Sequence, residues 1–281
     1  MADGSERLAG TCFFLGRPID GTDHHFGYFV TARHVIDGIR DLGLTEALIR
    51  LNSTTGQSFW AETEISAWQP HPDPGVDVAV FRSSIPEGAD HLVYPTTSAG
   101  ISSFLQREEI DIGSEAVVLG LFAHHFGADR NIPILRTGNI AAMCEEKVAT
   151  SAGLMDAYLV EVRSIGGLSG SPVFARTPPI RVTPEGKLLF NRKPNAAFFL
   201  LGLVHGHYDD TSAARVDIVA EDIAAVPSRI NVGIAIVVPV EKILEAIAQP
   251  AILSIEDPIA AELRRSFQPL KPPSEPEQSA G

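Results

Sequence analysis

Short hydrophobic segments separated by turn residues make up most of the chain. The segments are rich in β-branched and aromatic residues, and glycine, proline, asparagine or aspartate stands between most of them. This pattern predicts β-strands joined by short connections, and therefore an all-β fold. The predicted strands lie in GTCFFLG, GYFVTA, EALIRLN, QSFWAETEISAW, VDVAVF, EAVVLGLF, AYLVEV, SPVF, KLLF, FFLLGLV and NVGIAIVV.

Helical periodicity appears only near the carboxyl end. Apolar residues recur at helical spacing in VEKILEAI after Pro239, and Pro250 ends this run. A second short helix is expected to begin at Asp257 and Pro258. Residues 268–281, which are rich in proline, serine and glutamate, are expected to be a disordered tail.

The composition excludes several classes of partner. The chain has 281 residues, of which 44% are hydrophobic, so it can bury a sizeable core. Its formal net charge of -13 argues against nucleic acid and anionic membranes as partners, because both attract basic surfaces. The amino terminus has no basic patch followed by an apolar core, and no apolar run reaches the roughly 18 residues of a membrane span. These features predict a cytoplasmic protein.

Candidate chemistry begins with the stretch RSIGGLSGSPVF. Ser169 stands between glycines that allow a tight turn, and such a turn can gather backbone amides as an oxyanion hole requires. A serine nucleophile needs an imidazole to take its proton and a carboxylate to orient that imidazole. His34 follows an apolar strand in GYFVTARHV, and Asp77 leads into the apolar VAVF, which can shield a carboxylate from water.

Three motifs together resemble a known family. VTARHV, VDVAVF and GLSGSPVF are similar to the histidine, aspartate and serine motifs of trypsin-like serine proteases, in the same chain order. The resemblance extends over roughly Leu8 to Ile247 and is nearest to bacterial high-temperature-requirement-type proteases and glutamyl endopeptidases, without a PDZ domain. It implies two packed six-stranded antiparallel β-barrels of the chymotrypsin type and a C-terminal helix. The single peptidase domain would cover residues 8–265, with barrels at about 8–105 and 110–240 and helices at about 240–265.

The resemblance also implies the role of each site residue. Ser169 would be the nucleophile of a serine endopeptidase, His34 the base and Asp77 the orienting acid, and the amides of Gly167 and Ser169 would form the oxyanion hole. No cofactor is needed, and the substrate would be a protein or peptide. The substrate pocket would be lined by Arg163, Ser164, Ile165, Val204, His205 and Gly206.

One departure from the family bears on activation. Leu168 stands where trypsin has the aspartate that pairs with a freed amino terminus, so that switch is absent. The loop around Ser169 must then be held by packing, by substrate or by an activating partner, and the sequence does not identify such a partner.

Three alternatives stay open or are disfavoured. A catalytically silent protease-fold module would bind peptides without cleaving them. A serine esterase could use the same three residues, but Ser171 breaks the GxSxG pattern of that class. A metal site is disfavoured, because neither HExxH nor CxxC spacing occurs.

Overall fold

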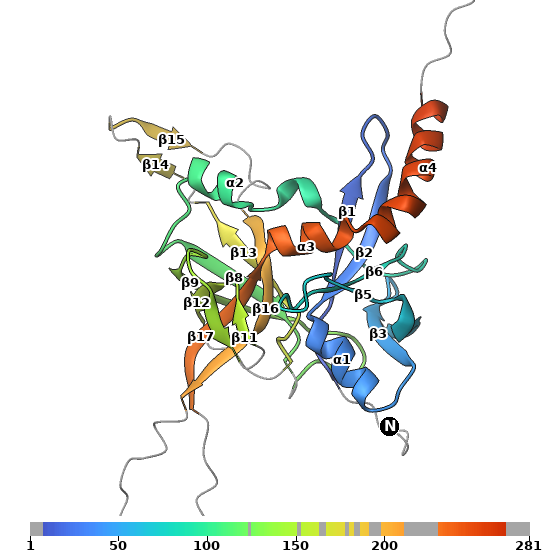
Figure 1. Cartoon of the computed structure of the whole chain (residues 1–281), viewed down its shortest axis with the longest axis horizontal. Helices are drawn as coiled ribbons and strands as arrows, with labels where there is room; N and C mark the ends of the chain where they lie inside the picture. Colours follow the sequence, from blue (N-terminus) through green and yellow to red (C-terminus); the bar gives the residue numbers. More distant parts are fainter. Residues whose placement is uncertain are drawn as a thin grey trace, which may run out of the picture.

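The structure is a computed structural model of the whole chain (Figure 1). It describes residues 8–122, 125–150, 153–162, 167–177, 180–182, 186–190, 198–210 and 230–267. The predicted disordered tail, residues 268–281, lies outside this part of the chain.

The carboxyl-terminal half closes into a six-stranded barrel with the strand order β12-β17-β16-β13-β8-β9 (Figure 1). All neighbouring strands are antiparallel, and the pairing of β9 with β12 closes the ring. The barrel interior holds alternate side chains of each strand, such as Val118, Val160 and Val173, which are fully buried. The strands are β8 (Glu115–Gly120), β9 (Ile134–Ala142), β12 (Tyr158–Glu161), β13 (Pro172–Arg176), β16 (Phe198–Asp210) and β17 (Ile230–Pro239). Two hairpins lie outside it, β10 (Val148–Thr150) with β11 (Gly153–Met155) and β14 (Ile180–Val182) with β15 (Leu188–Phe190).

The amino-terminal half forms an open five-stranded sheet in the order β5-β6-β2-β1-β7. Its strands are β1 (Phe13–Pro18), β2 (His25–Thr31), β5 (Gln69–Pro70), β6 (Ala79–Arg82) and β7 (Tyr94–Pro95). A separate hairpin of β3 (Glu46–Asn52) and β4 (Ser58–Glu64) packs on it through a cluster that includes Phe29, Ile49 and Trp68.

The described residues therefore do not show the second six-stranded barrel that the sequence predicted. The sheet stays open because β3 and β4 pair with each other over their whole length and not with β2 or β5. The short helix η1 (Ile65–Ala67) also turns the chain between β4 and β5. The first half is thus a sheet covered by a hairpin, and the prediction of an all-β fold with a carboxyl-terminal helical region is otherwise met.

The helices are more numerous than the periodicity predicted. Besides η1, they are α1 (Arg33–Asp41), η2 (Thr96–Ser98), α2 (Ser102–Arg107), α3 (Val240–Ile247) and α4 (Pro250–Ser266). Helix α3 agrees with the prediction, whereas the short second helix expected from Asp257 is one long helix, α4, with Pro258 in its interior. Helix α4 continues through Pro258 because Ile252, Glu256 and Ala260 form one buried face, four residues apart. None of the described helices is both long and apolar enough to cross a membrane.

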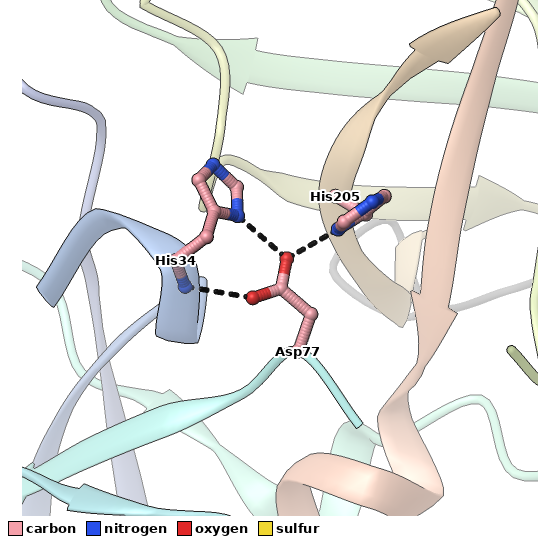
Figure 2. A group of neighbouring side chains, drawn as sticks. All are labelled: His34, Asp77 and His205. Carbon is pink, nitrogen blue, oxygen red and sulfur yellow. Dashed lines mark hydrogen bonds and ion pairs between the residues drawn. The ribbon is translucent and has the colours of Figure 1, made fainter. Parts of the chain in front are cut away.

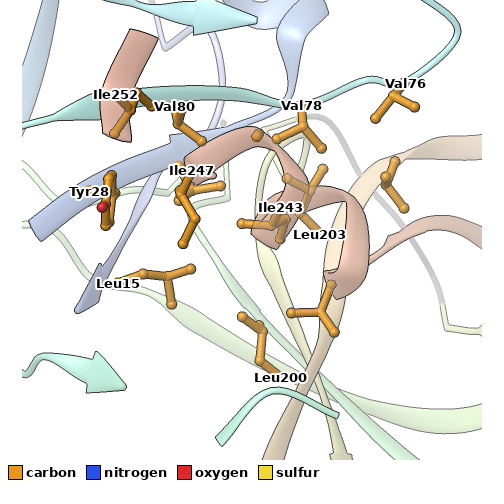
Figure 3. Packing of buried hydrophobic residues seen from close by; sticks show 14 of the residues in the cluster. Leu15, Tyr28, Val76, Val78, Val80, Leu200, Leu203, Ile243, Ile247 and Ile252 are labelled. Carbon is orange, nitrogen blue, oxygen red and sulfur yellow. The ribbon is translucent and has the colours of Figure 1, made fainter. Parts of the chain in front are cut away.

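One apolar cluster joins the two halves (Figure 3). Leu15, Tyr28 and Val80 from the sheet, Leu203 from the barrel and Ile243 from α3 all belong to it and are almost fully buried. Helix α3 contacts β6 of the sheet and both β16 and β17 of the barrel, so it links the two halves. The candidate site lies at this junction.

Candidate active site

Asp77 and His34 form the centre of the site (Figure 2). Asp77 precedes β6 and is 6% exposed. The backbone N–H of His34 donates to Asp77 Oδ1 at 2.8 Å, and His34 Nδ1 lies 2.7 Å from Asp77 Oδ2. The imidazole itself is 45% exposed, and its Nε2 makes no hydrogen bond to any described residue. The ring is therefore oriented from one side and accessible from the other.

The start of α1 explains this arrangement. The first N–H groups of a helix have no partner within the helix, and Ala32 at the N-cap has no side chain to bond them. Asp77 accepts a hydrogen bond from one of these amides, that of His34, and the negative charge of Asp77 lies at the positive end of the helix. The carboxylate thereby fixes both the backbone and the ring of His34.

His205 is a second imidazole on the same carboxylate (Figure 2). Its Nδ1 makes a short contact with Asp77 Oδ2, and its side chain is 11% exposed. The register of β16 against β17 shifts between Val204 and Gly206, so His205 occupies a β-bulge. Such a bulge re-aims a side chain. The resemblance implied a place for His205 in the substrate pocket, and nothing in the sequence predicted its bond to Asp77.

The hydrogen bonds determine the ionisation of these groups. Burial raises the pKa of the Asp77 carboxyl, but hydrogen bonds from His205 and His34 outweigh burial and hold this pKa below its ordinary value. For His34, burial lowers the pKa, but the hydrogen bond and charge of Asp77, with a smaller effect of Asp37, raise it above the ordinary value. Asp77 is thus a carboxylate at neutral pH, and His34 holds a proton more readily than a free histidine.

The loop around Ser169 lies against the same residues. The Ser169 hydroxyl is 3.5 Å from the backbone carbonyl of His205, at the limit of a hydrogen bond. The N–H of Gly170 donates to the carbonyl of Val204 at 2.8 Å. Gly170 has φ of +81°, and a Cβ there would lie 2.4 Å from Thr31 Oγ1, so the turn requires glycine.

Thr11 connects this loop to the amino-terminal sheet. Its N–H donates to the carbonyl of Ser169 at 2.8 Å, and its hydroxyl donates to the carbonyl of Gly167 at 2.8 Å. The same hydroxyl accepts the N–H of Leu121 at 3.1 Å, and the carbonyl of Thr11 accepts the hydroxyl of Thr31. Sequence reasoning missed Thr11, which carries no catalytic motif.

The other predicted site residues are placed as follows. Gly167 has φ of +98°, and neither its amide nor that of Ser169 donates a hydrogen bond to a described residue. The side chain of Val204 is 1% exposed and belongs to the barrel core. Gly206 faces open space, since no atom lies within 4 Å of a Cβ built there. The predicted pocket residues Arg163, Ser164 and Ile165 fall outside the described residues.

The same three side chains also offer ligand types that bind metal ions. His34, Asp77 and His205 each offer one ligand atom, and these atoms lie within 4.8 Å of one another. Two ligands of a tetrahedral zinc ion would be about 3.3 Å apart, given metal–ligand bonds of about 2.0 Å. The 2.7 Å between His34 Nδ1 and Asp77 Oδ2 is a hydrogen-bond distance. The geometry thus fits a hydrogen-bonded group better than an ion site.

Comparison with known proteins gives structural neighbours only. No protein-family model matches the chain, and no curated protein matches it. The MamO protease domain from Magnetospirillum magneticum is similar over 69% of this chain and 91% of its own, with 14% identity and a TM-score of 0.38. The murine norovirus NS6 protease is similar over 84% of this chain and 91% of its own, with 12% identity and a TM-score of 0.37. At these identities and scores the likeness assigns no function to this chain.

Proposed function

We propose that the chain is a chymotrypsin-like serine endopeptidase that uses Ser169, His34 and Asp77. The observation that carries this proposal is the pair of hydrogen bonds from His34 to the buried Asp77, with the Ser169 loop bonded to the adjacent β16. The order of the three motifs along the chain supports the same assignment.

The proposed reaction assigns each proton. Ser169 Oγ attacks the peptide carbonyl as its proton passes to His34 Nε2, and the tetrahedral oxyanion is stabilised by the amides of Gly167 and Ser169. His34 then gives the proton to the leaving amine, which leaves an acyl-enzyme ester on Ser169. Water hydrolyses this ester by the same route, and the serine is restored. Asp77 remains a carboxylate and stabilises the imidazolium.

One movement is required before attack. The Ser169 hydroxyl faces the carbonyl of His205 at 3.5 Å and bonds to neither imidazole. In the proposed reaction a rotation about the Ser169 side-chain bond brings the hydroxyl to His34 Nε2, and the His34 side chain is 45% exposed.

A second function is favoured by this same contact. A module that binds peptides without cleaving them would keep Ser169 on the His205 carbonyl permanently. Open space beside Gly206 suits an extended peptide in either case. The two functions differ only in whether the serine becomes reactive.

A fluorophosphonate probe distinguishes them, because it labels only an activated serine. We expect the probe to label the wild type but neither Ser169→Ala nor His34→Ala. Peptide cleavage should likewise be present in the wild type and lost in these two variants. Ser171→Ala is the matched control. This serine lies in the same motif, is fully buried, and its hydroxyl has no hydrogen-bond partner among the described residues, so labelling should persist. A chelator should change nothing.

No labelling of the wild type would favour the binding module, and activity on esters alone would favour an esterase. Labelling that survives in Ser169→Ala would exclude the assigned nucleophile.

A further inference from the structure

The side chain of His205 points to Asp77 and not into the open part of the site. Asp77 Oδ1 accepts the N–H of His34, and Asp77 Oδ2 faces both Nδ1 atoms, one from each imidazole (Figure 2). A carboxylate without a proton can only accept hydrogen bonds. Both imidazoles therefore carry a proton on Nδ1, and three N–H donors hold one buried carboxylate.

We propose that His205 is a positioning residue, whose Nδ1–H fixes Asp77 and thereby keeps His34 in the tautomer that leaves Nε2 free to accept the serine proton. This inference deepens the proposed serine peptidase function and rests on it for its catalytic consequence. The hydrogen-bonded arrangement itself is independent of that function.

The backbone around His205 supports this role. The β-bulge at His205 interrupts pairing with β17 where the side chain must turn toward Asp77, and Gly206 next to it adds no side chain. The carbonyl of His205 also contacts the Ser169 hydroxyl at 3.5 Å. One residue of β16 thus contacts both the proposed acid and the proposed nucleophile.

The contact between the two imidazole rings could not replace the hydrogen bond from His205 to Asp77. The imidazoles of His34 and His205 are edge-on, with centroids 5.5 Å apart and planes at 84°. No hydrogen bond joins these two described side chains. Asp77 is therefore the link between them, and a change at position 205 reaches His34 through the carboxylate.

Two substitutions separate positioning from simple packing. His205→Asn keeps a donor near the place of Nδ1, whereas His205→Leu introduces an apolar side chain of similar size and removes the donor. His24→Leu is the matched control, because this histidine is exposed in the turn before β2 and, among the described rings, meets only that of Phe267, edge-on.

The first measurement is the rate of fluorophosphonate labelling against probe concentration. Complete loss of an orienting acid costs about 10⁴-fold in this type of site. In His205→Leu both bonds from His34 to Asp77 remain available, so we expect a smaller loss, about 10- to 100-fold, in the maximal rate. The half-saturating probe concentration should not change, His205→Asn should recover most of the rate, and His24→Leu should equal the wild type.

The second measurement is ¹⁵N NMR of the imidazoles, with His34 assigned by its absence in His34→Ala. We expect Nδ1–H on His34 and His205 in the wild type, retention of the His34 signal in His205→Asn and a mixture of His34 tautomers in His205→Leu. An unprotonated Nδ1 on wild-type His205 would overturn the proposal even if His205→Leu does not fold. So would a His205→Leu variant that is labelled at the wild-type rate.

The two measurements also separate this inference from the proposed function. A wild type that shows the expected tautomers but no labelling contradicts the peptidase assignment and leaves the role of His205 at Asp77 intact.

Discussion

Thr11→Val tests how the serine loop is held. Valine has nearly the shape of threonine, so the substitution removes one hydroxyl and little volume. That hydroxyl donates to the carbonyl of Gly167 and accepts the amide of Leu121, so both backbone groups lose a partner. A fully buried group left without a partner costs about 1–3 kcal/mol, but Gly167 and Leu121 are only half-buried and water can replace part of the loss. We expect a loss of about 1–2 kcal/mol in unfolding free energy.

The effect of Thr11→Val on the reactivity of Ser169 should be larger than the loss of unfolding free energy implies. Gly167 precedes the proposed nucleophile by two residues, and its amide is a proposed oxyanion donor. Loss of one such donor costs about 100-fold or more, which sets the scale if the loop moves. Because Thr11 still bonds the carbonyl of Ser169 through its own amide, we expect a 10- to 100-fold lower labelling rate rather than a complete loss.

Thr22→Val is the matched control. The Thr22 hydroxyl likewise donates to a carbonyl, that of Ile19, and accepts an amide, that of His24, but it lies in the turn between β1 and β2. The assay compares labelling rates and denaturant unfolding of both variants with the wild type. The reasoning is refuted if Thr11→Val is labelled as fast as Thr22→Val at equal folded fractions.

Two further expectations concern stability and pH. Glu256→Gln should lower the unfolding free energy by about 2–4 kcal/mol, because the fully buried Glu256 carboxylate accepts hydrogen bonds from Tyr28, Arg17 and Arg82. Both arginines are partly exposed, so the loss is smaller than for a fully buried ion pair. Denaturant unfolding measures it, and equal stability of Glu256→Gln and the exposed control Glu262→Gln would contradict it. For pH, His34 must be neutral to take the serine proton and its pKa is raised, so the labelling rate should fall with acid at a pH above the ordinary histidine value of about 6.5. Asp77→Asn should move that midpoint down, and an unchanged midpoint would show that Asp77 does not control His34.

The sequence predicts the strands well and the way they assemble less well. Alternating or continuous apolar runs identify strands such as β2 and β8, because burial on one or both faces sets the pattern. Strand β9, ILRTGNIAA, was missed because polar residues interrupt it, and its place in the barrel depends on pairing with β8 and β12. Closure of a second barrel could not be judged from strands alone, since closure depends on which edges pair.

The site shows the same division between local and distant causes. Motif order singles out His34 and Asp77, and two hydrogen bonds join them. Helix α1 was missed because the group that accepts one of its free amino-terminal amides, that of His34, is Asp77, 43 residues away in the chain. The bond of His205 to Asp77 was missed because a bulge, which no spacing rule reveals, turns that side chain.

The shared cluster around α3 has a consequence for how the protein unfolds. Each half has an apolar cluster of its own, but residues such as Val80 and Leu203 are buried in the cluster that sheet, barrel and α3 share. Separately expressed halves would each present an uncovered apolar face and should recover a site only on recombination. Heat or denaturant should then abolish reactivity and melt the barrel in a single cooperative step.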